Sequence, residues 1–191
     1  MKEFAFLTAA ELAPLIQSKQ LSPVELTNQL LNRIEQQDPT LRSYITPLHE
    51  LALKQAKQAE HDIMHGNYIG PLHGIPLGIK DNYYTKGIRT TSGSKLFAHF
   101  IPDRSATAAA KLAAAGTITL GKLNMHELAL GSSSTNFTFG TTRILGIWII
   151  CPGAPAGAPA LPWQLDLPHL QQVQIRLVPS ACQLPCAGFM D

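Results

Sequence analysis

Apolar residues in the early part of the chain recur at helical spacing. Residues 8–11 (TAAE) form a capping box, which predicts a helix start, and residues 22–25 (SPVE) form a second one with proline at the first helical position. An apolar stripe over residues 26–34 continues the second helix, and Asp38-Pro39 is expected to end it, because proline disfavours helical geometry in the residue before it. A third helix is expected over residues 48–65. The pattern therefore predicts a layer of helices before any strand.

Two short apolar runs without helical spacing predict strands. Residues 75–79, bounded by glycine and proline, are typical of a buried strand, and this strand ends at Lys80. An alanine-rich helix is expected over residues 104–115, with Asp103 as its cap, and a short alternating strand over residues 117–120. A strand–helix–strand order with short connections indicates an α/β layer.

Lys80 is the first candidate for chemistry, because it stands where the predicted strand leaves the core. Burial of an amine favours its neutral form, which can accept a proton as a base. The alternative is a lysine whose aliphatic stem packs on the core while its amine reaches water. The strand alone leaves both interpretations open.

Several motifs around this strand occur in a defined order. They read GPLHGIPLGIKDN (residues 70–82), TKGIRTTSGSKLF (residues 85–97) and GKLNMHELALGSSSTNFTFGTTR (residues 121–143). Together they resemble the amidase signature family, the serine amidohydrolases that include bacterial amidases and the A subunit of the glutamyl-tRNA amidotransferase. The resemblance runs from about Phe6 to Arg143. It implies an α/β fold, with N-terminal helices and part of an α/β/α sandwich that has a mixed sheet.

The resemblance also implies roles for individual residues. Lys80 falls on the lysine that is the terminal base of the family's Ser-Ser-Lys triad. The loop with Gly131, Ser132 and Ser133 could contain a nucleophile, but no histidine base lies at a recognisable spacing and the family places its nucleophile elsewhere. We therefore expect this loop to line the cleft and to contact substrate. No metal or organic cofactor is implied, and the substrate is a small-molecule amide.

Other polar residues in the last motif are weaker candidates. His126 and Glu127 suit general acid–base chemistry, but in a short helical turn capped by Asn124 we expect them to be surface and cap residues. Residues 121–124 (GKLN) lack the leading glycine and the following Ser/Thr of a phosphate-binding loop. The spacing of His169, Cys182 and Cys186 fits no common metal site.

Composition narrows the classes of partner and location. A formal charge of +2 is too small to indicate a nucleic-acid surface, and the longest apolar runs are far shorter than a membrane span. The first residues contain an acidic side chain and no long apolar region, unlike a secretory signal. We therefore expect a cytoplasmic protein that binds neither membrane nor nucleic acid directly.

The character of the chain changes after Arg143. Residues 144–191 hold seven of the 14 prolines, all three cysteines and both tryptophans, but only three charged side chains. The family pattern calls for NPWDLD, then a loop GGSSGGS, then GTDTxGSIR, and none of these is present as written. The sequence after Arg143 therefore departs from the family where its serines are expected.

Loss of one nucleotide at the Arg143/Ile144 junction explains this departure. Each original codon would then be the last base of one present codon plus the first two bases of the next. On this basis residues 144–149 are compatible with NPWDLD, residues 151–164 with LPGGSSGGSGAAVA, and residues 173–179 with GTDTAGS. Because tryptophan has a single codon, the back-read codon that starts with its last base is fixed where the next residue allows only one reading. The residues fixed in this way agree with the family. We interpret residues 144–191 as a frameshifted, irregular tail and residues 1–143 as the N-terminal part of the amidase signature domain.

In this register the two catalytic serines would fall at Pro155 and Pro179, so the chain as written is expected to be inactive. The leading function is an amidase, and the alternative within the family is the A subunit of the amidotransferase, which releases ammonia from glutamine for partner subunits. From a different class, the chain would be a non-catalytic interaction protein whose Pro/Ala/Gly-rich tail is a linker.

Overall fold

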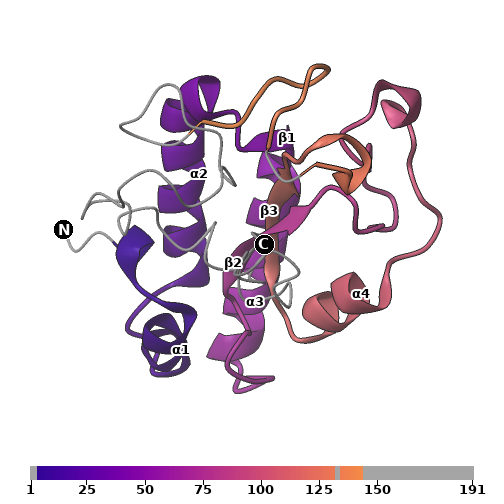
Figure 1. Ribbon diagram of the computed structural model, residues 1–191. Helices are drawn as coiled ribbons and strands as arrows, with labels where there is room; N and C mark the ends of the chain where they lie inside the picture. The colour runs from indigo at the N-terminus through magenta and orange to yellow at the C-terminus, as the bar shows by residue number, and fades with distance from the viewer. Residues whose placement is uncertain (1–3, 132–133, 144–191) are drawn as a thin grey trace, which may run out of the picture.

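The structure is a computed structural model, and it describes residues 4–131 and 134–143 (Figure 1). The expected irregular tail, residues 144–191, lies outside the described residues. The helices are α1 (Ala9–Gln17), α2 (Pro23–Leu41), α3 (His49–Met64) and α4 (Thr107–Ala114), with short 3-10 helices η1 (Phe4–Phe6), η2 (Lys95–Phe97) and η3 (Glu127–Ala129). The strands are β1 (Tyr44–Pro47), β2 (Pro76–Lys80) and β3 (Ile118–Leu123).

The three strands form one mixed sheet in the order β1-β3-β2. Strand β1 runs antiparallel to β3, whereas β2 runs parallel to it and places Lys80 opposite Leu123. Helix α4 connects the two parallel strands. This arrangement confirms the predicted α/β class with a mixed sheet.

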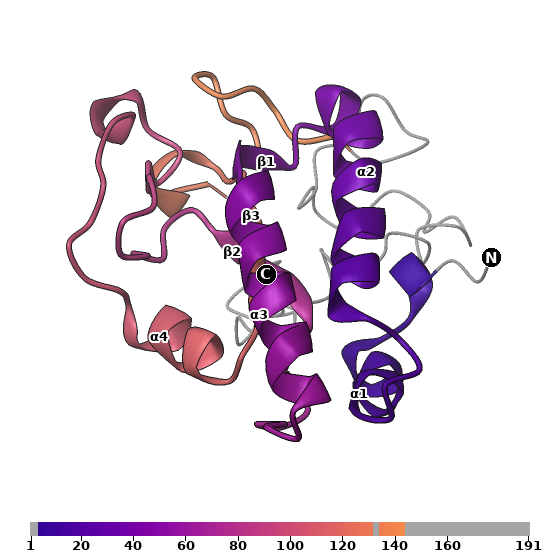
Figure 2. The ribbon, with the colours of Figure 1, turned by 180° about the vertical axis from the view of Figure 1, so that it is seen from behind.

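The helices cover the sheet unequally (Figures 1 and 2). Helix α3 packs on β3 and α2 packs on α3, so the apolar stripes of both helices meet the sheet in one core. Leu26, Leu30, Ile118 and Leu120 are almost fully buried in it. Helix α4 lies on the other side of the strands from α2. Of the helices described, none is long and apolar enough to cross a bilayer.

Capping explains where the first two helices begin. The Thr8 hydroxyl accepts a hydrogen bond from the Glu11 N–H, and the Glu11 carboxylate accepts one from the Thr8 N–H, so the predicted capping box is present in both directions. The Ser22 hydroxyl accepts from the N–H groups of Val24 and Glu25 at 3.1 Å each. Proline follows Ser22 at the first helical position, where its missing N–H removes no helical hydrogen bond.

The predicted end of α2 at Asp38-Pro39 is wrong. The helix continues to Leu41, and Arg42 then adopts the left-handed conformation with φ 54°. The Asp38 carboxylate accepts hydrogen bonds from the N–H groups of Ser43 and Tyr44 at 2.6 and 3.2 Å. Asp38 therefore holds the chain that leaves the helix, and a proline this close to the helix end is tolerated.

Further differences concern the strands and α4. Strand β1 was not predicted, because its four residues are too short to show alternation. Strand β3 is longer than predicted and buried at every position, so no alternation marks it. Helix α4 begins at Thr107, and its N-cap residue is Ala106 rather than Asp103.

Candidate functional site

The carboxyl ends of β2 and β3 meet at one edge of the sheet, because the two strands are parallel. In open α/β sheets, ligands bind beyond the carboxyl ends of the strands. Strand β2 ends at Lys80, and the turn that follows is closed by a hydrogen bond of 3.0 Å from the Tyr83 N–H to the Lys80 carbonyl. This edge is the candidate site, and it contains the lysine singled out in the sequence.

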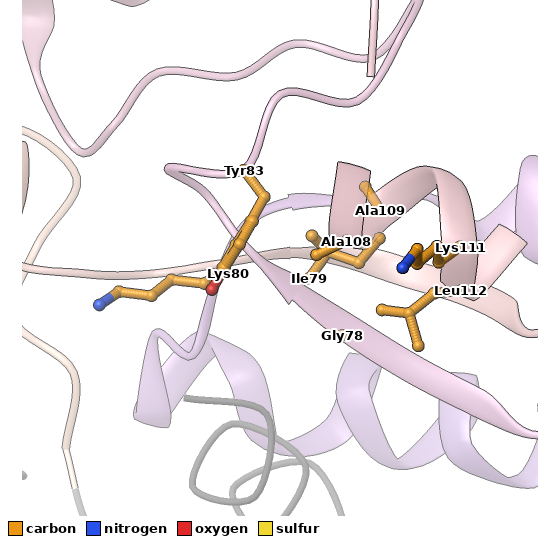
Figure 3. Close-up of a pocket in the computed structure, with 8 residues that line it drawn as sticks. All are labelled: Gly78, Ile79, Lys80, Tyr83, Ala108, Ala109, Lys111 and Leu112. Carbon is orange, nitrogen blue, oxygen red and sulfur yellow. The ribbon is translucent and has the colours of Figure 1, made fainter. Parts of the chain in front are cut away.

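Lys80 is half-buried, and within the described residues its amine has no hydrogen-bond or ion-pair partner. A pocket of about 250 Å³ lies between β2 and α4, lined by Ile79, Ala109 and Leu112 among others. Figure 3 shows the Lys80 side chain extending away from the α4 residues. The amine is therefore directed away from this apolar pocket.

Asp81, directly after Lys80, is fully buried and organises the edge. Its carboxylate Oδ2 accepts hydrogen bonds from the Thr91 N–H at 2.8 Å and from the Thr91 hydroxyl at 2.5 Å. Its own N–H donates to the Leu123 carbonyl at 3.2 Å. Asp81 thus joins the end of β2 to the end of β3 and to the loop around Thr91.

Lys122, on β3, is the second lysine of the site and is fully buried. Its amine donates to the Tyr83 carbonyl at 2.6 Å, the Thr90 hydroxyl at 2.8 Å and the Thr85 hydroxyl at 3.3 Å. It also lies 3.7 Å from Oδ1 of Asp81. Burial lowers the pKa of Lys122 to about 8, and the attraction of Asp81 opposes this shift.

Lys122 was missed in the sequence, where residues 121–124 were considered as the start of a family motif and as a phosphate-binding loop. These residues instead form the end of β3 and the position after it. One signal in the sequence could have identified Lys122 and Asp81 as a pair. A lysine within an apolar strand and an aspartate just after the neighbouring parallel strand are positioned to share a face, and here Lys122 aligns with Ile79, two residues before Asp81.

The loop around Thr91 connects this edge to the last motif. The Ser92 N–H donates to the Asp81 carbonyl at 3.2 Å, and the Leu128 N–H donates to the Ser92 carbonyl at 2.8 Å. Ser92, Leu128 and Ala129 all have positive φ, between 51° and 58°. Left-handed backbone is unfavourable for such residues and is concentrated at functional sites in proteins.

Two asparagines of the last motif hold the loops in place. The Asn136 amide donates to the carbonyls of Gly93 and Met125 at 2.7 and 2.9 Å. The Asn124 amide donates to the carbonyls of Arg42 and Gly140 at 2.9 and 2.8 Å. Asn124 therefore does not cap the following turn, which is the 3-10 helix η3 with His126 at its N-cap.

Of the predicted substrate-binding residues, Gly131 is described, whereas Ser132 and Ser133 lie outside the described residues. Gly131 is exposed, and a Cβ atom added at this position would collide with the His126 ring. His126 is half-buried and contacts the Glu127 carbonyl at 3.2 Å. Within residues 4–131 and 134–143, no cluster of three or more His, Cys, Asp or Glu side chains could hold a metal ion.

Comparisons with known proteins point to one family. A family model described as Amidase matches residues 25–144. Among curated relatives, the A subunit of the glutamyl-tRNA(Gln) amidotransferase from Synechococcus sp. (strain JA-3-3Ab) is 45% identical over 143 residues, which are 75% of this chain and 28% of the relative. The same protein from Geobacter metallireducens (strain ATCC 53774 / DSM 7210 / GS-15) is 47% identical over 137 residues, 72% of this chain and 28% of the relative.

Solved structures agree on the fold. The native peptide amidase from Stenotrophomonas maltophilia superposes with a TM-score of 0.67 and 33% identity, over 73% of this chain and 30% of that protein. A bacterial aryl acylamidase of the amidase signature family superposes with a TM-score of 0.68 and 29% identity, over 73% of this chain and 29% of that protein. The chain thus spans less than a third of the length of these relatives.

Proposed function

Because this chain belongs to the amidase family, we propose that it is the lysine-bearing N-terminal portion of a C–N hydrolase in which Lys80 is the general base. The observation that carries the proposal is the position of Lys80. It lies at the carboxyl edge of parallel strands, half-buried, with no partner for its amine among the described residues. A base needs such an amine, because a lysine engaged in ion pairs is held in its charged form.

The proposed reaction is amide hydrolysis through an acyl-enzyme. A serine hydroxyl attacks the amide carbonyl, and its proton passes through a second serine to the Lys80 amine. The C–N bond then breaks, and the nitrogen leaves with that proton as ammonia or an amine. Water hydrolyses the acyl-enzyme by the same route. The loop with Gly131, Ser132 and Ser133 lines the cleft and contacts the substrate.

The chain as written lacks the serines that this reaction needs. In the back-read register they fall at Pro155 and Pro179, and the family match ends at residue 144, next to the proposed frameshift junction. Loss of the nucleophile removes nearly all catalysis in hydrolases of this type. We therefore propose that the 191-residue chain is catalytically incomplete. We further propose that a frame-restored protein, in which the reading frame continues over the length of the relatives, is active.

Two measurements test this proposal. The first is the nucleotide sequence across codons 140–150 from independent clones, which is expected to reveal one missing base. The second compares hydrolysis of a simple amide by the 191-residue chain and by the frame-restored chain. We expect no turnover by the first and turnover by the second. Turnover by the chain as written that is abolished by Lys80→Ala would overturn the proposed inactivity.

A second candidate, the A subunit of the amidotransferase, is favoured by the identity to relatives so named. These relatives are 45% and 47% identical, against 33% and 29% for the two solved amidases. On this alternative the frame-restored protein is a cytoplasmic component that hydrolyses glutamine and passes ammonia to partner subunits. Glutaminase activity that depends on such a partner would support it, whereas hydrolysis of simple amides by the isolated protein supports the amidase.

A further inference from the structure

The buried lysine of β3 has contacts that reach the turn after the proposed base. We propose that Lys122 is a positioning residue: its three hydrogen bonds fix the turn that follows Lys80 and thereby the orientation of the Lys80 side chain. The inference rests on the proposed function, in which Lys80 is the base.

All three hydrogens of the Lys122 ammonium have an acceptor, and the acceptors lie on a single segment. They are the Tyr83 carbonyl at 2.6 Å and the hydroxyls of Thr85 and Thr90 at 3.3 and 2.8 Å. The ammonium therefore fastens residues 83–90 to β3 at several points. A lysine retained only for its aliphatic stem would not need this set of acceptors.

Tyr83 transmits this restraint to Lys80. Its N–H donates to the Lys80 carbonyl at 3.0 Å and closes the turn, while its carbonyl accepts from Lys122. In Figure 3, Tyr83 and Lys80 lie next to each other at the end of β2. Lys122 aligns with Ile79 in the sheet, so it shares a face with Ile79 and Asp81 rather than with Lys80. Lys122 thus acts through the backbone and not on the reacting atoms.

Asp81 supplies the charge that makes this burial tolerable. Its carboxylate Oδ1 lies 3.7 Å from the Lys122 amine and has no hydrogen-bond partner among the described residues. Well-packed apolar residues often stabilise a fold as well as a buried ion pair does, so stability alone is a weak reason for this pair. The Asp81–Lys122 pair is better explained if it specifies one conformation of the chain. That conformation is the turn after Lys80.

The test measures how Lys80 is presented in the 191-residue chain. Trace acetylation with acetic anhydride at about pH 7, followed by peptide-resolved mass spectrometry, gives the labelling rate of Lys80 relative to the exposed Lys54 on α3. Without Lys122 the turn opens, and Lys80 leaves its half-buried position. For Lys122→Met we expect this ratio to rise roughly threefold or more, since hydrogen bonds from a charged group are lost. Lys57→Met, which removes another exposed lysine of α3, is the matched control and should leave the ratio unchanged.

A second pair of variants covers the case in which Lys122→Met does not fold. Thr90→Val removes one acceptor at nearly constant volume, whereas Thr90→Ser keeps the hydroxyl. We expect Thr90→Val to raise the Lys80 ratio by a smaller factor and Thr90→Ser to leave it near the parent value. An unchanged ratio in Thr90→Val and in any folded Lys122→Met protein, together with a lower thermal midpoint, overturns the proposal and leaves Lys122 a purely structural residue.

The labelling ratio does not depend on turnover, so the two proposals fail separately. Amide hydrolysis by the frame-restored protein, or glutamine hydrolysis with its partner subunits, that survives Lys80→Met refutes Lys80 as a base, whatever the labelling shows. An unchanged ratio refutes the positioning role of Lys122, even if the frame-restored protein is active.

Discussion

Lys80 and Lys122 lie at the ends of neighbouring parallel strands, yet their surroundings are opposite. Lys80 is half-buried, and the described residues offer its amine no partner. Lys122 is completely buried, with three hydrogen bonds and the carboxylate of Asp81 nearby. In the register of the sheet, Lys80 is one residue beyond the position that aligns with Lys122, so the two side chains lie on opposite faces of the sheet.

On the proposed function, this difference separates the group that reacts from a group that stabilises the structure. A fully satisfied buried amine is committed to its partners, so a proton transfer at that amine would disrupt several contacts together. An amine without partners can exchange a proton while the fold is unchanged. The contrast predicts that changes on the Lys80 side affect activity and that changes on the Lys122 side affect stability and the geometry of the turn.

The largest effect is expected at Lys80. In the frame-restored protein, Lys80→Met keeps the aliphatic stem and removes the base, so kcat/KM for amide hydrolysis should fall by roughly a thousandfold or more. In the 191-residue chain, the free energy of unfolding should change by less than about 0.5 kcal/mol, because the amine has no partner among the described residues. Steady-state kinetics and urea denaturation measure the two quantities. Lys95→Met, at an exposed lysine of η2, is the control, and equal losses of activity in both variants would contradict the assignment.

The next effect is expected at Asp81. In the 191-residue chain, Asp81→Asn leaves the Lys122 ammonium buried without its counter-charge, and removing one member of a buried pair typically costs about 3–5 kcal/mol. The double variant Asp81→Asn/Lys122→Met should be less destabilised than the sum of the single variants, because the unpaired charge is gone. Urea midpoints of the four proteins form the cycle, with the exposed Asp103→Asn as control. Additive effects would show that the pair is not coupled.

The same contrast explains how much of the site the sequence could predict. The position of Lys80 at the end of β2 could be predicted, because a strand end is visible in the pattern; its role as a base stays a prediction. The capping residues Thr8 and Ser22 were predictable for a local reason, since the hydrogen bonds they accept come from N–H groups within three residues. The class of fold followed from the strand–helix–strand order.

Lys122 and the end of α2 could not be predicted in this way, because tertiary contacts decide them. The acceptors of Lys122 lie 32 to 39 residues away in sequence, and nothing local distinguishes a buried lysine from one at the surface. Asp38-Pro39 is typical of a helix end, but the helix continues because the Asp38 carboxylate captures the N–H groups of Ser43 and Tyr44 beyond it. Strand β1 depends on pairing with β3, which is distant in sequence.

A smaller effect is expected from pH. The folded chain binds the Lys122 proton with a pKa of about 8, below the ordinary value of 10.5 that applies when the chain is unfolded. Between these values the unfolded chain holds more protons, so the free energy of unfolding should rise as pH increases from about 8 toward 10.5. The full gain is on the order of 3 kcal/mol.

Comparison with Lys122→Met isolates this contribution. Burial raises the pKa of Tyr44 above its ordinary value of 10.0, and Tyr44 therefore opposes the gain at the upper end of the range. Because Tyr44 is common to both proteins, the difference between their urea midpoints at about pH 7.5, 8.5 and 9.5 reports Lys122. Asp81 is the charged group that faces the Lys122 amine. A difference that does not vary with pH would show that Lys122 keeps its proton throughout.

The smallest effect on stability is expected at Gly131, which lies in the loop proposed to contact substrate. In the frame-restored protein, a methyl group in Gly131→Ala would press on the His126 ring. Because that ring is half-buried and can turn away, the free energy of unfolding should fall by less than about 1 kcal/mol. KM should rise roughly 3–10-fold, with kcat nearly unchanged, since the loop is proposed to bind substrate and to take no part in proton transfer. Adding His126→Ala relieves the contact and should return KM toward the parent value. If kcat falls while KM stays constant, the loop acts on the catalytic groups. The distinction between residues that react and residues that stabilise the structure is then wrong at this position.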